Sequence, residues 1–170
     1  MTRRDFIRKW LTYALALLPV WLLDCYILSR YRLWGTAPML LPLAAAAVAV
    51  LEGAYAGTGF GLAVGLLWEA AYPGGFGGLV FGMALAGMAM GAVTQYALKQ
   101  SFFGCLICSA GVLAALDFLR VARGLFTGSA TLTALLQTAV PEFLWSLAWT
   151  PLVWFLFRAV HQRVGGNRLA

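Results

Sequence analysis

The amino-acid sequence predicts an all-α, polytopic membrane protein with about six transmembrane helices in a single domain, residues 1–170. Of the 170 residues, 62% are hydrophobic and only 11% are charged, whereas soluble domains carry about 25% charged residues. The apolar runs are continuous, which suits spanning helices and not the alternating strands of a β-barrel. Between Glu52 and Gly91, glycines recur every fourth residue, a spacing that lets membrane helices pack closely.

A basic segment, residues 1–9, precedes the first apolar run, residues 10–28. The segment approximates a twin-arginine leader. However, the apolar run is long enough to span the membrane and no small-x-small cleavage site follows it. We therefore expect an uncleaved first helix with a cytoplasmic N-terminus. Pro19 is expected to kink this helix, and Asp24 is expected to reach the lipid headgroups.

The second helix is predicted over residues 33–51, with Pro38 and Pro42 near its start. Four consecutive alanines, residues 44–47, leave its middle thin on all sides, so we expect close neighbours around it. The third and fourth helices follow, joined by a neutral turn at residues 72–75, and the fourth is expected to end near Lys99.

The fifth helix is predicted over residues 102–119, and a polar loop, residues 124–133, leads into the last helix. A short tail, residues 164–170, follows. If six helices cross the membrane, eight lysines and arginines lie on the side of the N-terminus and four on the other side. Because cytoplasmic loops carry the excess of basic residues, we expect both termini in the cytoplasm of a bacterium, with the chain in its cytoplasmic (inner) membrane.

The glycines of the third and fourth helices are predicted to be helix-packing or partner-binding residues. Glycine costs about 1 kcal/mol relative to alanine inside a water-exposed helix, so their density indicates contact surfaces within a bilayer. At four-residue spacing, small residues share one face of a helix. The set comprises Gly57, Gly61, Gly65, Gly78, Gly82, Gly87 and Gly91.

Four charged residues are candidates for buried polar contacts, because charge inside a membrane is costly and often functional. Asp117 and Arg120 are three residues apart, so we expect a local ion pair near the outer surface. Glu69 precedes the predicted turn, and an interfacial anchor, an interhelical acceptor and a ligand contact all remain open for it. Glu142 follows Pro141, whose missing N–H leaves a carbonyl free nearby, and is the better candidate for a buried contact.

The sequence offers no catalytic residues, metal site or cofactor site. The only histidine, His161, lies in the basic C-terminal region. Cys105 and Cys108 have C-x-x-C spacing, but no second ligand pair accompanies them, so we interpret them and Cys25 as packing residues. The basic residues lie at predicted helix ends, which indicates membrane orientation and argues against nucleic-acid binding.

Four features of the sequence resemble the MreD family of bacterial rod-shape proteins. They are, in chain order, Pro38-Met39-Leu40-Leu41 at the start of the second helix, Gly65-Leu66-Leu67-Trp68-Glu69 at the end of the third, Gly77-Gly78-Leu79 after the turn, and the small residues of the fourth helix. Members more often carry aspartate where Glu69 stands, and glutamate keeps the charge. The resemblance covers most of the chain.

The resemblance implies a non-enzymatic scaffold of the cell-elongation (rod-shape) machinery, which maintains cell shape and supports peptidoglycan synthesis. The implied partners are the membrane-anchored protein MreC and, directly or indirectly, the RodA glycosyltransferase and its penicillin-binding transpeptidase, together with membrane lipid. The implied fold is similar to the substrate-binding subunit of energy-coupling-factor vitamin transporters. On this interpretation, the glycine faces support a bundle whose surface receives a partner's single transmembrane helix.

The alternative function is the substrate-binding component of such a vitamin transporter. Its ligand pocket would use the four polar candidates near the outer face. The outer loops are short and poor in the Asn, Gln, Tyr and His residues that such pockets need. A lipid-processing membrane enzyme is a third hypothesis, and the sequence lacks the clustered His, Asp or Cys residues that it would need.

Overall fold

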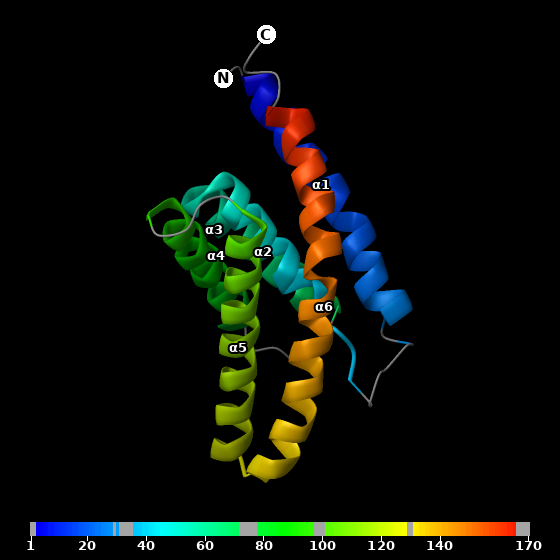
Figure 1. Cartoon of the computed structure of the whole chain (residues 1–170), viewed down its shortest axis with the longest axis vertical. Coiled ribbons are helices and arrows are strands. Elements are labelled where there is room, and N and C mark those ends of the chain that lie inside the picture. The colour runs from blue at the N-terminus through cyan, green and yellow to red at the C-terminus, as the bar shows by residue number, and fades with distance from the viewer. Residues whose placement is uncertain are drawn as a thin grey trace.

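The computed structural model describes residues 3–28, 30, 36–71, 78–96, 101–128 and 131–165. Its regular elements within these ranges are helices, which confirms the predicted all-α class (Figure 1). In chain order they are α1 (Arg3–Leu22) with the π-helical segment η1 (Leu23–Leu28), α2 (Leu40–Glu52), α3 (Ala54–Ala71), α4 (Gly78–Tyr96), α5 (Phe102–Phe126) and α6 (Leu132–Gly165).

Four described segments are long and apolar enough to cross a membrane, as expected for a multi-pass membrane protein. The prediction of about six spans is correct in the number of helices, but neither α3 nor α2 is among these four segments. Helix α2 is the shorter of the two. This helix has 13 residues, which is a length of about 20 Å, against a hydrocarbon thickness of about 30 Å. The four segments are Phe6–Leu28, Gly78–Tyr96, Phe102–Phe126 and Leu132–Val164.

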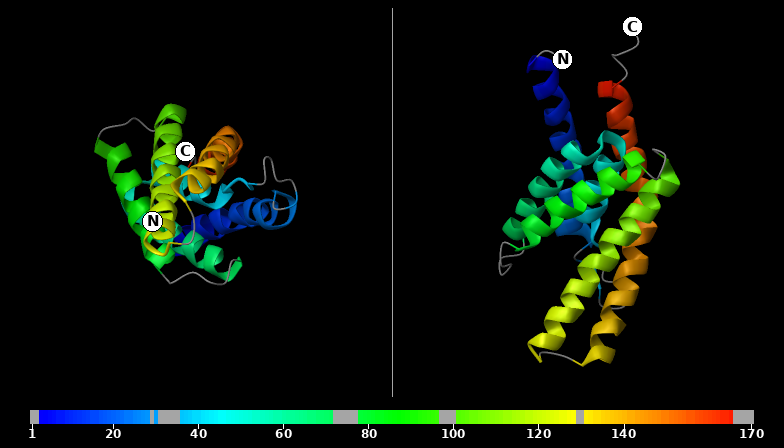
Figure 2. Two further views of the ribbon diagram at one scale, coloured as in Figure 1. Left: turned by 90° about the horizontal axis from the view of Figure 1, so that it is seen from below. Right: turned by 90° about the vertical axis from the view of Figure 1, so that its left-hand side faces the viewer.

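Helices α3 and α4 lie on one side of the bundle, at the left of Figure 1, and α1 and α6 lie on the other side. At one end of the molecule, the start of α1 lies near the end of α6. At the opposite end, α5 and α6 form a hairpin that extends beyond the other helices, as the right-hand view of Figure 2 also shows. Helices α2, α3 and α4 lie between these ends, and α2 contacts each of the other five.

Helix α2 is the core of the bundle. Its residues are buried from Leu40 to Leu51, and the four alanines at positions 44–47 are each 0% exposed. Methyl side chains let neighbouring helices approach from every side. The expectation of close neighbours around the alanines is therefore confirmed.

The second helix begins at Leu40, later than predicted. Proline disfavours helical conformation in the residue before it, so Pro38 disfavours a helix at Ala37, and Met39 just before α2 is extended, with φ −100° and ψ 98°. Pro42, by contrast, lies in the first turn of α2, where a backbone N–H has no intrahelical acceptor to lose. The predicted residues 33–35 lie outside the described ranges.

The predicted polar loop at residues 124–133 is too long at both ends. Helix α5 continues to Phe126, and α6 already begins at Leu132. Gly124 is a buried residue of α5 that packs against α6, since a Cβ atom there would lie 3.0 Å from Cδ1 of Leu135. The chain then leaves α5 through Gly128, whose φ of 62° suits glycine.

Several other predictions fall on parts of the chain outside the described ranges. These are the turn at residues 72–75, the end of the fourth helix near Lys99, and residues 166–170 of the tail.

Candidate functional site

Helices α3 and α4 pack together along a line of glycines. A Cβ atom on Gly61 would lie 2.3 Å from the carbonyl oxygen of Met83, and one on Gly87 would lie 2.1 Å from the carbonyl oxygen of Gly57. Real Cβ atoms essentially never come within 3.0 Å of such neighbours. The two backbones are therefore in direct contact, which maximises van der Waals packing where lipid provides no hydrophobic drive between helices.

The same contact runs along most of the pair. Near the end of α3, a Cβ atom on Gly65 would lie 2.7 Å from Cα of Val80. At the other end, one on Gly91 would lie 2.4 Å from the backbone nitrogen of Ala54. Gly53 connects α2 to α3 there with a φ of 89°, a conformation that favours glycine.

Two glycines of the predicted set lie elsewhere. Cβ atoms on Gly78 and Gly82 would meet no atom within 4 Å. The glycines are thus not one surface: five of them form the α3–α4 contact, and these two face outward from α4. Gly61 is covered by α4, so of the two roles predicted for the glycines its position agrees with helix packing.

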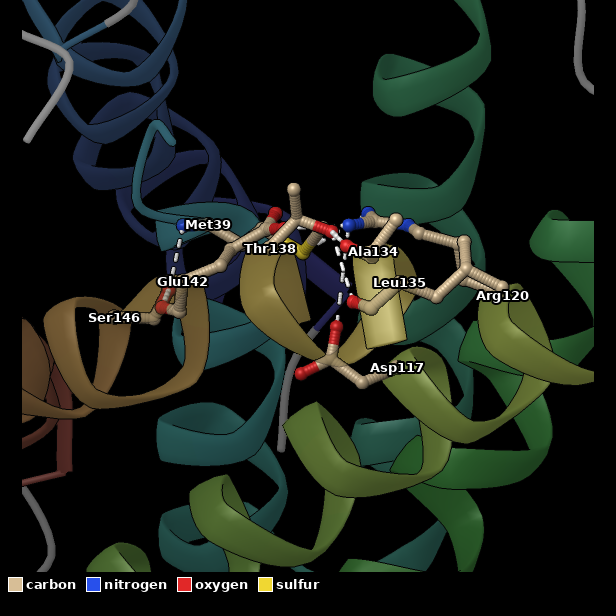
Figure 3. Close-up of polar contacts among 8 residues, drawn as sticks. All are labelled: Met39, Asp117, Arg120, Ala134, Leu135, Thr138, Glu142 and Ser146. Carbon is tan, nitrogen blue, oxygen red and sulfur yellow. Dashed lines mark hydrogen bonds and ion pairs between the residues drawn. The ribbon is translucent and has the colours of Figure 1, made fainter. Parts of the chain in front are cut away.

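Three of the four polar candidates meet between α5 and α6 (Figure 3). Nη1 of Arg120 lies 2.6 Å from Oε2 of Glu142 and 3.9 Å from Oδ1 of Asp117. Both carboxylates are largely buried, whereas the arginine is half exposed. Nη2 of Arg120 also approaches the sulfur of Met39, 3.8 Å away. The guanidinium therefore bridges the two helices, and its main partner is the distant Glu142.

Glu69 does not join this cluster. It lies near the end of α3 and is half buried. Its Oε1 atom is buried and has no hydrogen-bond partner within the described part of the chain. The four candidates consequently do not line one common pocket, and this arrangement does not favour the vitamin-transporter alternative.

A second ionic cluster, which sequence reasoning missed, joins α1, α2 and α6. We call Lys9, Tyr13, Glu52 and His161 the Glu52 cluster. The Tyr13 hydroxyl donates to Oε1 of Glu52 at 2.8 Å, and Nδ1 of His161 lies 2.9 Å from the same oxygen. Lys9 forms an ion pair with Oε2. The Glu52 carboxylate is only 10% exposed, so these three side chains replace water around it.

The Glu52 cluster favours one tautomer of His161. An ionised carboxylate only accepts hydrogen bonds, so the contact with Glu52 is a hydrogen bond in the tautomer of His161 that carries its proton on Nδ1, which also lies 3.1 Å from the Tyr13 hydroxyl. Burial alone would raise the pKa of Glu52, but the hydrogen bonds from Lys9, Tyr13 and His161 and the charge of Lys9 outweigh burial and hold this pKa below its ordinary value. The carboxylate is therefore ionised at neutral pH.

No group of three or more His, Cys, Asp or Glu side chains that could hold a metal ion occurs among the described residues. Cys25, Cys105 and Cys108 are free thiols. The sulfur of Cys105 lies 3.9 Å from Oγ of Ser109 on the same helix.

Comparison with protein families decides what this bundle is. Residues 4–164 match the family model of rod shape-determining protein MreD. The chain belongs to the MreD family. Searches of curated proteins and of solved structures give no match, so the expected similarity to vitamin-transporter subunits remains a prediction.

Membership of the MreD family confirms the resemblance and a role in rod-shape determination. The proline-leucine motif at the start of α2 is held by side chains from two other elements. Oδ1 of Asp24, in η1, accepts a hydrogen bond from the backbone nitrogen of Leu40 at 3.0 Å, and Oγ of Ser146, in α6, accepts one from Met39 at 2.9 Å. Both N–H groups lack intrahelical acceptors. Asp24 is therefore buried, and the expectation that it reaches the headgroups is wrong.

Removing this acceptor should destabilise the start of α2. We expect Asp24→Ala to lower the free energy of unfolding by about 1–3 kcal/mol, because the buried N–H of Leu40 loses its partner. Asp24→Asn keeps an acceptor oxygen in place and should cost less than about 1 kcal/mol. Equilibrium unfolding of the two purified variants in mild detergent measures the difference. Equal stability of the two variants would contradict the capping role.

Proposed function

We propose that this chain is a non-enzymatic membrane scaffold of the cell-elongation machinery, which binds an MreC-like protein and thereby supports peptidoglycan synthesis and cell shape. The observation that carries the proposal is the family match over residues 4–164. The proposed location is the bacterial cytoplasmic membrane, with both termini in the cytoplasm. In support, residues 1–9 hold four cations and one carboxylate, and residues 156–170 hold three arginines and no carboxylate.

The outward side of α4 is the surface we assign to the partner. Gly82 has open space in front of it, and it lies beside Phe81 and Leu85, which are 71% and 61% exposed. A glycine between large apolar side chains leaves a shallow groove, into which the ridge of another membrane helix packs. We therefore assign this apolar groove to a single apolar transmembrane helix of the kind that anchors an MreC-like protein.

The test of the proposed function is a pull-down of the tagged full chain from its native membranes in mild detergent, with partners identified by mass spectrometry. We expect recovery of an MreC-like protein, and of RodA and its penicillin-binding transpeptidase directly or through it. Recovery of none of these would overturn the proposal. An ATPase pair with a coupling membrane subunit would instead indicate a transporter.

A pair of matched glycine variants tests the assigned surface. Gly82→Leu fills the groove on α4, so we expect recovery of the MreC-like protein to fall at least about tenfold, which corresponds to a loss of about 1.4 kcal/mol. Gly59→Leu is the control, because Gly59 also faces open space but lies on α3. Both variants should insert and fold as the wild type does. Undiminished recovery with Gly82→Leu would exclude this face.

A further inference from the structure

The described cations at the end of the molecule where α1 begins and α6 ends differ in their surroundings. Lys9 and His161 contact Glu52. The exposed cations are Arg3, Arg4, Arg8, Arg158 and Arg163. The ion pairs among the described side chains engage none of these five arginines. Because Lys9 and His161 already bind Glu52, this carboxylate does not neutralise the exposed arginines.

Three of the exposed arginines continue exposed apolar stripes on their helices. On α1, Arg4 and Arg8 stand at helical spacing above Leu11 and Leu15, which are 59% and 58% exposed. These positions lie on one face of the helix. On α6, Arg158 follows the exposed Phe155 by three residues and therefore lies on the same face of α6 as Phe155. Their guanidinium groups therefore stand where an apolar membrane-facing surface meets the headgroup layer.

Aromatic residues mark the same depth. Trp10 lies one turn inside α1, where it packs edge-on against Phe6 at a centroid distance of 6.1 Å. Tryptophan is enriched where the hydrocarbon layer meets the headgroups. Arginine side chains beside such a residue extend toward the headgroups while their aliphatic stems cover apolar surface.

We propose that Arg4 and Arg8 on α1 and Arg158 on α6 bind anionic phospholipid headgroups. A guanidinium group presents paired N–H donors that match two oxygens of a phosphate. Clusters of basic residues beside a membrane-spanning helix attract anionic lipid. At the other end of the bundle, Arg120 is neutralised by Glu142 and Asp117, so the two ends differ in the net charge that they offer to lipid.

Glu52 also links the two helices that carry these arginines, because its carboxylate contacts Lys9 of α1 and His161 of α6. The proposal does not depend on an MreC-like partner, so its failure and that of the proposed function are distinguishable.

Native mass spectrometry of the full chain in neutral detergent tests the proposal, with phosphatidylglycerol or phosphatidylcholine as the added lipid. We expect tighter binding of phosphatidylglycerol. Each Arg→Gln change should weaken it about fivefold, so the triple variant R4Q/R8Q/R158Q should lose about two orders of magnitude. Arg8→Lys should retain more binding than Arg8→Gln because it keeps the charge, and Arg30→Gln, at the other end of the first span, is the matched control.

Three outcomes would overturn the proposal. Equal binding of the two lipids by the wild type is one, and an Arg30→Gln loss as large as that of Arg8→Gln is another. The third is competition by free glycerol phosphate at the concentration at which the lipid binds, since this would identify a soluble phosphate as the ligand. Binding that weakens with added salt and resists glycerol phosphate supports the lipid surface.

Discussion

Replacing Gly61 by leucine is expected to force α3 and α4 apart. Even a Cβ atom at this position would lie 2.3 Å from the carbonyl oxygen of Met83, and a backbone carbonyl inside a helix has little freedom to move. Overpacking of a close contact costs about 1–3 kcal/mol for small additions. We therefore expect about 3 kcal/mol or more for leucine, measured as a loss of unfolding free energy in detergent.

Gly82→Leu is the control for this substitution. It adds the same side chain to the neighbouring helix at a position with open space around it. We expect it to change the unfolding free energy by less than about 0.5 kcal/mol, as is usual for surface substitutions. If the two variants were equally stable, α3 and α4 would not be in the backbone contact described above.

Replacing Glu52 by leucine should be the most damaging change to the ionic contacts. It leaves Lys9, whose side chain is 16% exposed, without its counter-charge, and the fully buried Tyr13 without its acceptor. Loss of one partner of a buried ion pair costs about 3–5 kcal/mol. Thermal unfolding in detergent should report this as a drop of roughly 6–20 °C, at about 2–4 °C per kcal/mol for a protein of this size.

Removal of both charges distinguishes the destabilisation caused by an unpaired buried charge from that caused by lost packing. The double variant Lys9→Met/Glu52→Leu should recover much of the stability, because no unpaired charge remains buried. Stability of Glu52→Leu equal to that of the wild type would show that the cluster does not hold α1, α2 and α6 together. No recovery in the double variant would show that Tyr13 and His161 carry most of the effect.

The pH dependence of stability provides a further check on Glu52. Its pKa in the folded protein lies below the ordinary value of 4.5. The cluster should therefore contribute its full stability above about pH 4.5 and lose it as the pH falls through the folded pKa. Glu52→Gln should show a smaller loss of stability in this acidic range.

The patterns that the sequence predicted well are those that act through neighbours on one helix. Four-residue spacing of Gly57, Gly61 and Gly65 puts them on one face whatever else surrounds them. A run of four alanines is thin from any direction. Local spacing can also place Asp117 beside Arg120, and the structure has them 3.9 Å apart.

The features that sequence reasoning missed depend on residues distant along the chain. Glu52 contacts side chains 39 and 109 positions away, and Arg120 makes its shorter ion pair with Glu142, 22 positions away. Gly82 follows the same spacing rule as Gly61, yet only one of them is covered. Helical periodicity defines the faces of a helix, but it does not say which face meets a neighbour.

The amino-acid sequence by itself determined that this protein is a helical membrane protein of the MreD family, because apolar content, helix length and small-residue spacing are local properties. Tertiary structure alone decided which glycines pack, which carboxylates are buried and which cations remain outside. These outcomes depend on the order and crossing of six helices. In a membrane, many apolar faces are nearly equivalent in hydrophobicity, and close packing together with a few buried polar contacts selects among them.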